Sequence, residues 1–156
     1  MSGPALTPES ADLVELRHLV HRYAGAVDDR DPAGVAGLFT DDGVLATAQP
    51  PTHLDPVEEH VGQAGVRAAM EQVLGLRGTF HAACGEVFTA GTDADTATGR
   101  IACEAHHYTD SPDGPRDLVW TVTYRDHYRR TPAGWRFSRR EVHVGSVRTQ
   151  TLKAVR

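Results

Sequence analysis

Cysteine, methionine and aromatic residues are scarce in this chain of 156 residues, which has two Cys, two Met and 6% Phe, Trp and Tyr. The two thiols, Cys84 and Cys103, are separated by polar sequence and provide neither a disulfide framework nor a paired metal knuckle. We therefore expect two buried, reduced thiols. Histidines with the H-E-x-x-H spacing of a zinc site are also lacking, so the sequence predicts no metal.

Long apolar runs and a continuous basic stripe are missing as well. No segment approaches the roughly 20 apolar residues that cross a bilayer, and the start, MSGPALTPES, lacks the basic and apolar regions of a secretory signal. The net charge is -5, with basic residues interspersed among acidic ones. We therefore expect a cytoplasmic protein with neither nucleic acid nor a membrane as a partner.

Hydrophobic residues make up 40% of the chain, enough for one domain with its own core. We expect this domain to span residues 1–156, with residues 1–6 flexible and residues 149–156 forming a tail.

Three segments on the N-terminal side have helical patterns. The first has a cap and a proline at Thr7 and Pro8, then an apolar stripe at three- and four-residue spacing, and is expected to end near Arg30. Asp31 and Pro32 repeat the start signal for a short second helix. A third stripe covers residues 66–74 and is closed by Gly75 or Gly78.

The remaining pattern predicts strands. Residues 44–48 are typical of a short strand, whereas residues 49–61 contain three prolines and no clear period, which predicts a long loop and a candidate lid. From Thr79 onward, β-branched and aromatic runs alternate with turn residues and predict four long antiparallel strands. Helices followed by consecutive strands indicate an α+β fold.

Alternation within two of these strands predicts their faces. Residues 118–128 place Leu118, Trp120, Val122, Tyr124 and Tyr128 on one face, with polar residues on the other. In the last strand the apolar positions change parity, which predicts a β-bulge near Arg139 or Arg140. Bulges of this kind curl a long sheet into a cone.

Four segments resemble the SnoaL-like branch of the nuclear transport factor 2-like superfamily, and together they extend over nearly the whole chain. They are RYAGAVDDRDPAGVAGLFTDDGVL (22–45), TFHAACGEVF (79–88), ATGRIACEAHHY (97–108) and AGWRFSRREV (133–142). The resemblance implies a cone-shaped, cystatin-like α+β fold, with three helices packed on a strongly curved, mixed but mainly antiparallel sheet. It also implies a homodimer or homotrimer, since an open curved sheet leaves an apolar outer face.

Within this superfamily the sequence is most similar to scytalone dehydratase-like enzymes and hexachlorocyclohexane dehydrochlorinase. These enzymes pair an aspartate at a helix end with a strand histidine, and the matching positions are Asp28 and His81. The second strand histidine of the dehydratases corresponds to His106. The chain departs from the dehydratase pattern near Thr47, where a tyrosine is expected, and at Tyr124, where an asparagine is expected.

These residue types are suited to acid–base catalysis without a metal or cofactor. An imidazole with an ordinary pKa of about 6.5 can accept a proton near neutral pH if a carboxylate fixes its tautomer. Asp28 would orient His81 as general base, and His106 or a water would protonate a departing hydroxyl. The expected substrate-binding residues, which supply phenolic donors and apolar walls, are Tyr23, Phe39, Met70, Leu74, Trp120 and Tyr124.

Strand parity leaves one assignment open. Cys103 and Ala105 share a face with His107, whereas Glu104 and Tyr108 share the opposite face with His106. Only a bulge or a polar pocket face would place His106 inside the cavity.

The leading hypothesis is therefore a cofactor-independent lyase, a dehydratase or eliminase, or a related isomerase or cyclase. Its substrate would be a small hydrophobic polyketide, terpenoid or aromatic metabolite. Two alternatives share the fold: a non-catalytic small-ligand-binding or interaction domain, and the small subunit of a ring-hydroxylating dioxygenase.

Overall fold

One six-stranded sheet in the order β2-β1-β6-β5-β4-β3 organises the computed structural model, which describes residues 6–153. All neighbouring strands are antiparallel except β1 and β6, which are parallel. The predicted α+β class with a mixed, mainly antiparallel sheet is thus confirmed. The elements are α1 (Ser10–Asp28), α2 (Pro32–Ala36), β1 (Phe39–Gln49), β2 (His53–Val61), α3 (Gly62–Glu71), the 3-10 helix η1 (Gln72–Gly75), β3 (Gly78–Ala90), β4 (Thr96–Thr109), β5 (Arg116–Thr131) and β6 (Gly134–Thr151).

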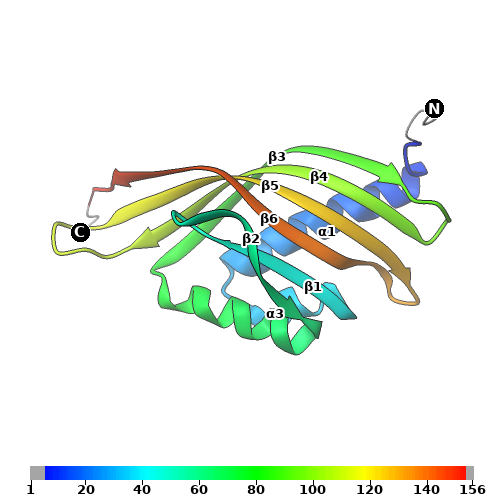
Figure 1. The fold of residues 1–156 in the computed structure, drawn as a ribbon, viewed down its shortest axis with the longest axis horizontal. Coiled ribbons are helices and arrows are strands. Elements are labelled where there is room, and N and C mark those ends of the chain that lie inside the picture. The colour runs from blue at the N-terminus through cyan, green and yellow to red at the C-terminus, as the bar shows by residue number, and fades with distance from the viewer. Residues whose placement is uncertain (1–5, 154–156) are drawn as a thin grey trace.

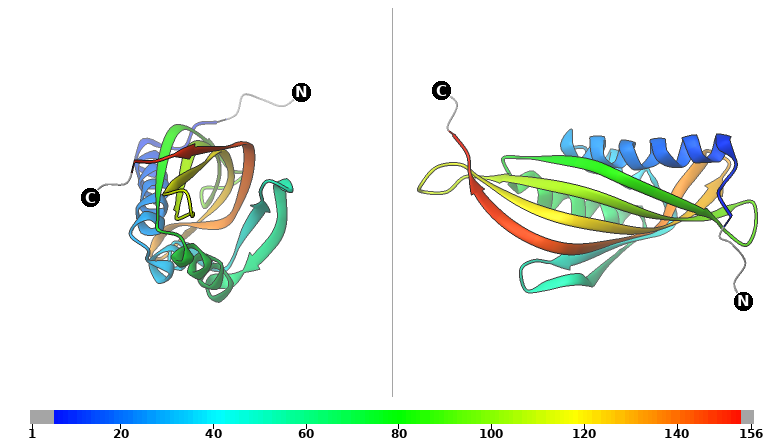
Figure 2. Two further views of the ribbon diagram at one scale, coloured as in Figure 1. Left: turned by 90° about the vertical axis from the view of Figure 1, so that its left-hand side faces the viewer. Right: turned by 90° about the horizontal axis from the view of Figure 1, so that it is seen from above.

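The sheet is strongly curved, and α1 and α3 close its open side (Figures 1 and 2). Two extra residues on β6, Ser138 and Gly145, interrupt its pairing with β5. The bulge predicted near Arg139 or Arg140 is confirmed, because Ser138 is the extra residue between Phe137 and Arg139. After this bulge Arg140 and Val144 are buried, which explains the change of parity along the strand.

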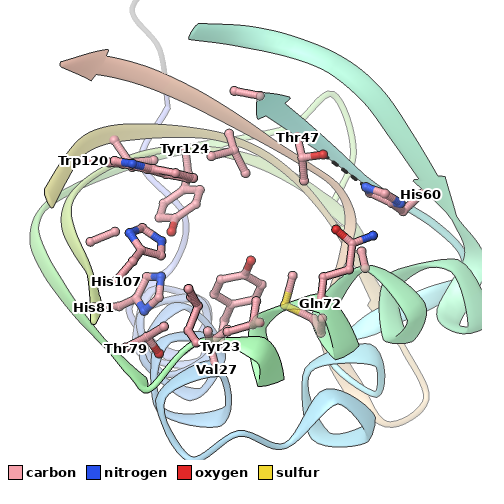
Figure 3. A pocket seen from close by; sticks show the side chains of 18 of the residues that line it. Tyr23, Val27, Thr47, His60, Gln72, Thr79, His81, His107, Trp120 and Tyr124 are labelled. Atoms are coloured by element: carbon pink, nitrogen blue, oxygen red, sulfur yellow. Dashed lines mark hydrogen bonds between the residues drawn. The ribbon is translucent and has the colours of Figure 1, made fainter. Parts of the chain in front are cut away.

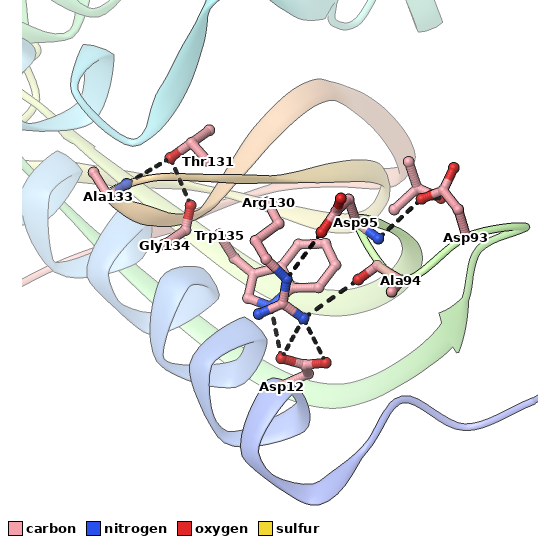
Figure 4. A network of polar contacts seen from close by, with 10 residues as sticks. Asp12, Asp93, Ala94, Asp95, Arg130, Thr131, Ala133, Gly134 and Trp135 are labelled. Carbon is pink, nitrogen blue, oxygen red and sulfur yellow. Dashed lines mark hydrogen bonds and ion pairs between the residues drawn. The ribbon is translucent and has the colours of Figure 1, made fainter.

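A polar cluster joins the start of α1 to the β3–β4 and β5–β6 turns (Figure 4). The Arg130 guanidinium donates to both oxygens of Asp12, at 2.7 and 2.8 Å, and the Trp135 indole donates to the same carboxylate at 3.1 Å. Arg130 also stacks on the Trp135 ring, with its carbon 4.6 Å from the ring centroid. These contacts fix α1 across the sheet, so that its last residue, Asp28, lies against β3.

Helix ends differ from the sequence prediction by a few residues. Thr7 does not cap α1: the helix begins at Ser10, and Glu9 at the cap position makes no side-chain cap hydrogen bond. It ends at Asp28, before Arg30 adopts a positive φ of 59°. The Asp31 cap of α2 is confirmed, since its side chain accepts from the Gly34 N–H at 2.9 Å.

The predicted loop at residues 49–61 is wrong, because residues 53–61 form β2, which pairs antiparallel with β1. Pro50 and Pro51 lie in the hairpin turn rather than in a mobile lid. Pro56 is tolerated because β2 is an edge strand, where one side of the backbone needs no N–H donor. The preceding strand, β1, is accordingly longer than the predicted residues 44–48.

Two further expectations need correction. Residues 149–151 are not a tail, because they pair with β5, for example Thr151 with Arg116; residues 1–5 and 154–156 lie outside the described part. Cys103 is buried as expected, but Cys84 is exposed, because it is the extra residue of a bulge in the edge strand β3. None of the helices within residues 6–153 is long and apolar enough to cross a membrane.

Candidate active site

A cavity of about 370 Å³ lies between the inner face of the sheet and the helices α1, α3 and η1 (Figure 3). Its size is near the lower end of the range of about 300–1,000 Å³ that is typical of small-molecule sites. Apolar walls come from α1, α3, η1 and the inner face of the strands, and include Val27, Met70, Val73, Val122 and Val142. The polar side chains of the lining come mainly from the strands.

Asp28 and His81 meet at one wall of this cavity. Asp28 Oδ1 lies 2.7 Å from His81 Nδ1, and its Oδ2 accepts the His81 main-chain N–H at 2.8 Å. The Thr79 hydroxyl donates to Oδ1 at 2.9 Å. The carboxylate at the end of α1 is therefore bound by three groups of β3, and this contact is the one that the sequence resemblance implied.

The electrostatics of this contact keep Asp28 ionised. Burial raises the pKa of the Asp28 carboxyl, but the hydrogen bonds from His81 and Thr79 outweigh burial and lower the pKa below its ordinary value. A carboxylate can only accept hydrogen bonds, so His81 Nδ1 carries a proton and its N–H donates a hydrogen bond to Asp28. In the neutral ring Nε2 is then unprotonated and can accept a proton from a bound molecule.

A second histidine, His107 on β4, lines the same wall (Figure 3). Its ring centroid lies 6.0 Å from that of His81 and 4.1 Å from the Trp120 ring. The Nδ1–H donates to the Leu118 carbonyl at 3.1 Å. Burial lowers the pKa of His107 to about 4, so at neutral pH the ring is uncharged and its Nε2 is an acceptor.

His106 lies on the opposite face of β4 and does not line the cavity. The pairing of β4 with β5 runs without a bulge, so neighbouring residues alternate strictly between the two faces. His106 Nδ1 contacts Asp117 Oδ2 at 2.6 Å, and its Nε2 contacts Glu104 at 3.2 Å. The expected catalytic position of His106 is thereby corrected, and His107 is the histidine that faces the cavity.

Two tyrosines, Tyr23 from α1 and Tyr124 from β5, point their hydroxyl groups into the cavity (Figure 3). Their rings meet edge to face with centroids 6.0 Å apart. The buried Arg140 guanidinium lies 4.2 Å from the Tyr23 centroid and 4.1 Å from the Tyr124 centroid, and binds Asp126 at 2.8 and 2.9 Å. Burial raises the pKa of both phenols, so both remain protonated donors.

The other expected wall residues divide into two groups. Met70 and Trp120 line the cavity. Phe39 does not, because it is 1% exposed and packs on Phe137 in the core, with ring centroids 5.2 Å apart. Leu74 does not line the cavity: it is 40% exposed and lies at a small hollow beside α1 and α2.

The cavity also contains polar residues that are not among the expected catalytic and substrate-binding residues. Thr47 and His60 belong to the β1–β2 hairpin, and their side chains lie 3.1 Å apart, Oγ1 to Nε2. Gln72 of η1 points toward the same region (Figure 3). The sequence predicts a loop over residues 49–61, so it gives no sign of the strand alternation in β2 that aims His60 inward. Within residues 6–153, no group of three or more His, Cys, Asp or Glu side chains is arranged to hold a metal ion.

A curved sheet closed by helices around a cavity, with a His–Asp pair in its wall, defines a cone-shaped α+β domain with a cavity of small-molecule size. The family model for the SnoaL-like domain matches residues 8–141, so the chain belongs to the SnoaL-like family. The resemblance drawn from the sequence is thereby confirmed.

One relative and several solved structures are similar to this chain over most of its length. An uncharacterised protein of Mycobacterium tuberculosis is 27% identical over 132 residues, which are 85% of this chain and 84% of the relative. A candidate scytalone dehydratase from Novosphingobium aromaticivorans has a TM-score of 0.75 at 20% identity, covering 92% of this chain and 91% of that one. A hexachlorocyclohexane dehydrochlorinase from Novosphingobium barchaimii has a TM-score of 0.73 at 16% identity, with 90% of each chain covered.

The fold itself is matched by an NTF2-like protein with a cystatin-like fold from Novosphingobium aromaticivorans, with a TM-score of 0.63 and 26% identity over 87% of this chain and 84% of that chain. The expected NTF2-like, cystatin-like architecture is therefore confirmed. The fold is shared with proteins named as a dehydratase and a dehydrochlorinase.

Proposed function

We propose that this protein is a cofactor-independent lyase that removes water from a small hydrophobic β-hydroxy ketone of polyketide, terpenoid or aromatic origin. The observation that supports the proposal most is the 2.7 Å contact between Asp28 Oδ1 and His81 Nδ1 in the wall of the cavity. A related isomerase or cyclase would use the same first step, proton removal next to a carbonyl.

In that first step His81 Nε2 takes the proton from the carbon next to the carbonyl. Asp28 stabilises the imidazolium that forms, because its carboxylate already accepts the Nδ1–H. Negative charge then develops on the carbonyl oxygen. The Tyr23 and Tyr124 hydroxyls are the donors suited to stabilise that charge, since both are protonated and line the cavity.

In the second step the C–O bond breaks, the carbon–carbon double bond forms, and the departing hydroxyl needs a proton. His107 does not supply it at neutral pH, because burial lowers its pKa to about 4. The His81 imidazolium formed in the first step is the acid at hand, and it returns the same proton to give water. His107 Nε2 is an acceptor that orients the hydroxyl, so both events occur on one face of the substrate.

The names of two structural neighbours, a dehydratase and a dehydrochlorinase, denote loss of water and of hydrogen chloride and are consistent with an elimination. At 20% and 16% identity these neighbours show a shared fold alone. The proposed chemistry is therefore argued from the residues of this chain.

The test is turnover of a panel of one- and two-ring β-hydroxy ketones, followed by the ultraviolet absorbance of the conjugated enone. We expect His81→Asn to lower kcat by about 10²–10⁴-fold, the usual contribution of a general base. His106→Asn is the matched control: it removes a histidine of the adjacent strand that also contacts a carboxylate but lies outside the cavity. It should leave kcat within about twofold, because removing a group that does not touch the substrate costs little.

The second candidate is a non-catalytic ligand-binding domain, which a cavity of small-molecule size also supports. Tight binding of panel members without turnover, or equal rates for wild type and His81→Asn, would replace the lyase by this candidate.

A further inference from the structure

The polar groups of the cavity form two sets at opposite walls (Figure 3). One is the His81 and His107 wall described above. The other, here called the hairpin set, consists of Thr47 on β1, His60 on β2 and Gln72 on η1. The proposed elimination uses the first set together with the Tyr23 and Tyr124 hydroxyls, and none of its steps involves the hairpin set.

The hairpin set has hydrogen-bond donors and acceptors that the described residues of the protein do not use fully. Thr47 Oγ1 and His60 Nε2 lie 3.1 Å apart and share a single proton. If His60 donates, the Thr47 hydroxyl proton and one lone pair remain for a ligand; if Thr47 donates, both of its lone pairs remain as acceptors. The Gln72 carboxamide adds a further donor and a further acceptor. The set can therefore bind an oxygen that donates, accepts or does both.

The charges around the cavity favour a neutral ligand oxygen over an anionic one. None of the described residues that line the cavity is Lys or Arg, and Glu58 adds a carboxylate beside the hairpin set. The Arg140 guanidinium, which stacks on the Tyr23 and Tyr124 rings, is already bound by Asp126 through two contacts. An anionic group would lose its hydration without gaining a cation in return, which is costly. A neutral hydroxyl or carbonyl that is hydrogen-bonded in the cavity avoids the cost of burying an unpaired charge.

We propose that the hairpin set is a second binding subsite, which holds a neutral hydroxyl or carbonyl at the end of the ligand remote from the Asp28–His81 pair. This inference rests on the proposed function in one respect, namely that the end of the ligand beside the Asp28–His81 pair is the end that reacts. It predicts a ligand with oxygen functions at both ends of an apolar ring system and without a carboxylate or phosphate.

Binding of three naphthalene probes, measured by titration calorimetry, tests the subsite without requiring turnover. The probes are 2-naphthol with one oxygen, 2,6-dihydroxynaphthalene with oxygens at both ends, and 6-hydroxy-2-naphthoate with an anionic end. We expect the diol to bind about tenfold more tightly than 2-naphthol, the effect of one added hydrogen bond, and the naphthoate to bind more weakly than the diol.

Thr47→Val removes the hydroxyl and keeps a β-branched side chain that suits a strand. This variant should lose the preference for the diol while its affinity for 2-naphthol stays the same. Thr123→Val is the matched control, since Thr123 is a half-buried strand threonine that does not line the cavity. Gln72→Met, on an exposed position of η1, is a second variant that should reduce the preference without perturbing the sheet.

Three results would overturn the proposal: equal binding of diol and 2-naphthol by the wild type, an unchanged preference in Thr47→Val and Gln72→Met, or tighter binding of the naphthoate. Failure of all three probes to bind would also contradict it, because the subsite requires a cavity that accepts neutral oxygenated rings. Diol preference with no turnover of any β-hydroxy ketone would instead contradict the lyase proposal and leave the subsite standing.

Discussion

Asp28 and His81 are 53 residues apart in the sequence, yet one carboxylate oxygen of Asp28 lies 2.7 Å from His81 Nδ1 and the other accepts the His81 main-chain N–H. The carboxylate therefore fixes both the ring and the strand that carries it. Because the two residues come from α1 and β3, the contact forms only when the helix is docked on the sheet. Stability and chemistry should consequently respond together to changes at Asp28.

The first prediction concerns acid stability. The pKa of Asp28 is lowered in the folded protein, so its ionised form contributes stability above the ordinary aspartate pKa of about 3.9. That contribution is lost as the pH falls through the lowered pKa. Thermal unfolding of wild type and Asp28→Asn between pH 6 and pH 3 should show a stability difference that shrinks at the acidic end. A difference independent of pH would contradict the assigned charge state.

A second prediction concerns His107. Its pKa is lowered to about 4 by burial, whereas the unfolded chain has an ordinary histidine pKa of about 6.5. The unfolded state binds more protons between these values, so this residue costs stability progressively as the pH falls from about 6.5 to about 4. In NMR titrations the His107 ring signal should stay at its neutral position at pH 5.5. Protonation at pH 6 or above would contradict the assignment and restore His107 as a candidate acid.

The sequence was sufficient for most of the fold and for the Asp28–His81 pair. Helical stripes and strand alternation are local patterns, and the family motif ties Asp28 to His81. The choice between His106 and His107 depended on whether β4 contains a bulge, which no residue in that segment indicates. His60 of the hairpin set could not be predicted, because Pro50, Pro51 and Pro56 give its segment a loop signal. Two of these prolines lie in a turn, and the third is accommodated on an edge strand.

A third prediction concerns the buried ion pair below the tyrosines. Asp126 and Arg140 are 1% and 0% exposed, and the carboxylate makes two contacts with the guanidinium. Asp126→Ala leaves a buried charge without a partner and should lower the free energy of unfolding by about 3–5 kcal/mol in urea titrations. Glu59→Ala, which removes the exposed partner of Arg139, should cost less than about 1 kcal/mol. Similar costs for both variants would contradict a structural role for the buried pair.

A fourth prediction separates the two thiols. Cys84 is exposed, whereas Cys103 is 4% exposed and burial raises the pKa of its thiol to about 11. Because the thiolate is the reactive form, iodoacetamide at pH 8 should modify Cys84 alone in the folded protein and both residues in urea. Mass spectrometry of the digested protein identifies the modified residue. Modification of Cys103 under native conditions would show that this part of β4 opens.

The most direct test of the central claim isolates proton removal from elimination. In D₂O, 1-tetralone can exchange the protons next to its carbonyl but has no β-hydroxyl to lose, and NMR measures the exchange rate. The account predicts that wild type and the exposed control Asp29→Asn accelerate exchange, and that Asp28→Asn and His81→Asn reduce the acceleration by at least about 10²-fold. Equal exchange rates in all four proteins would contradict His81 as a general base oriented by Asp28.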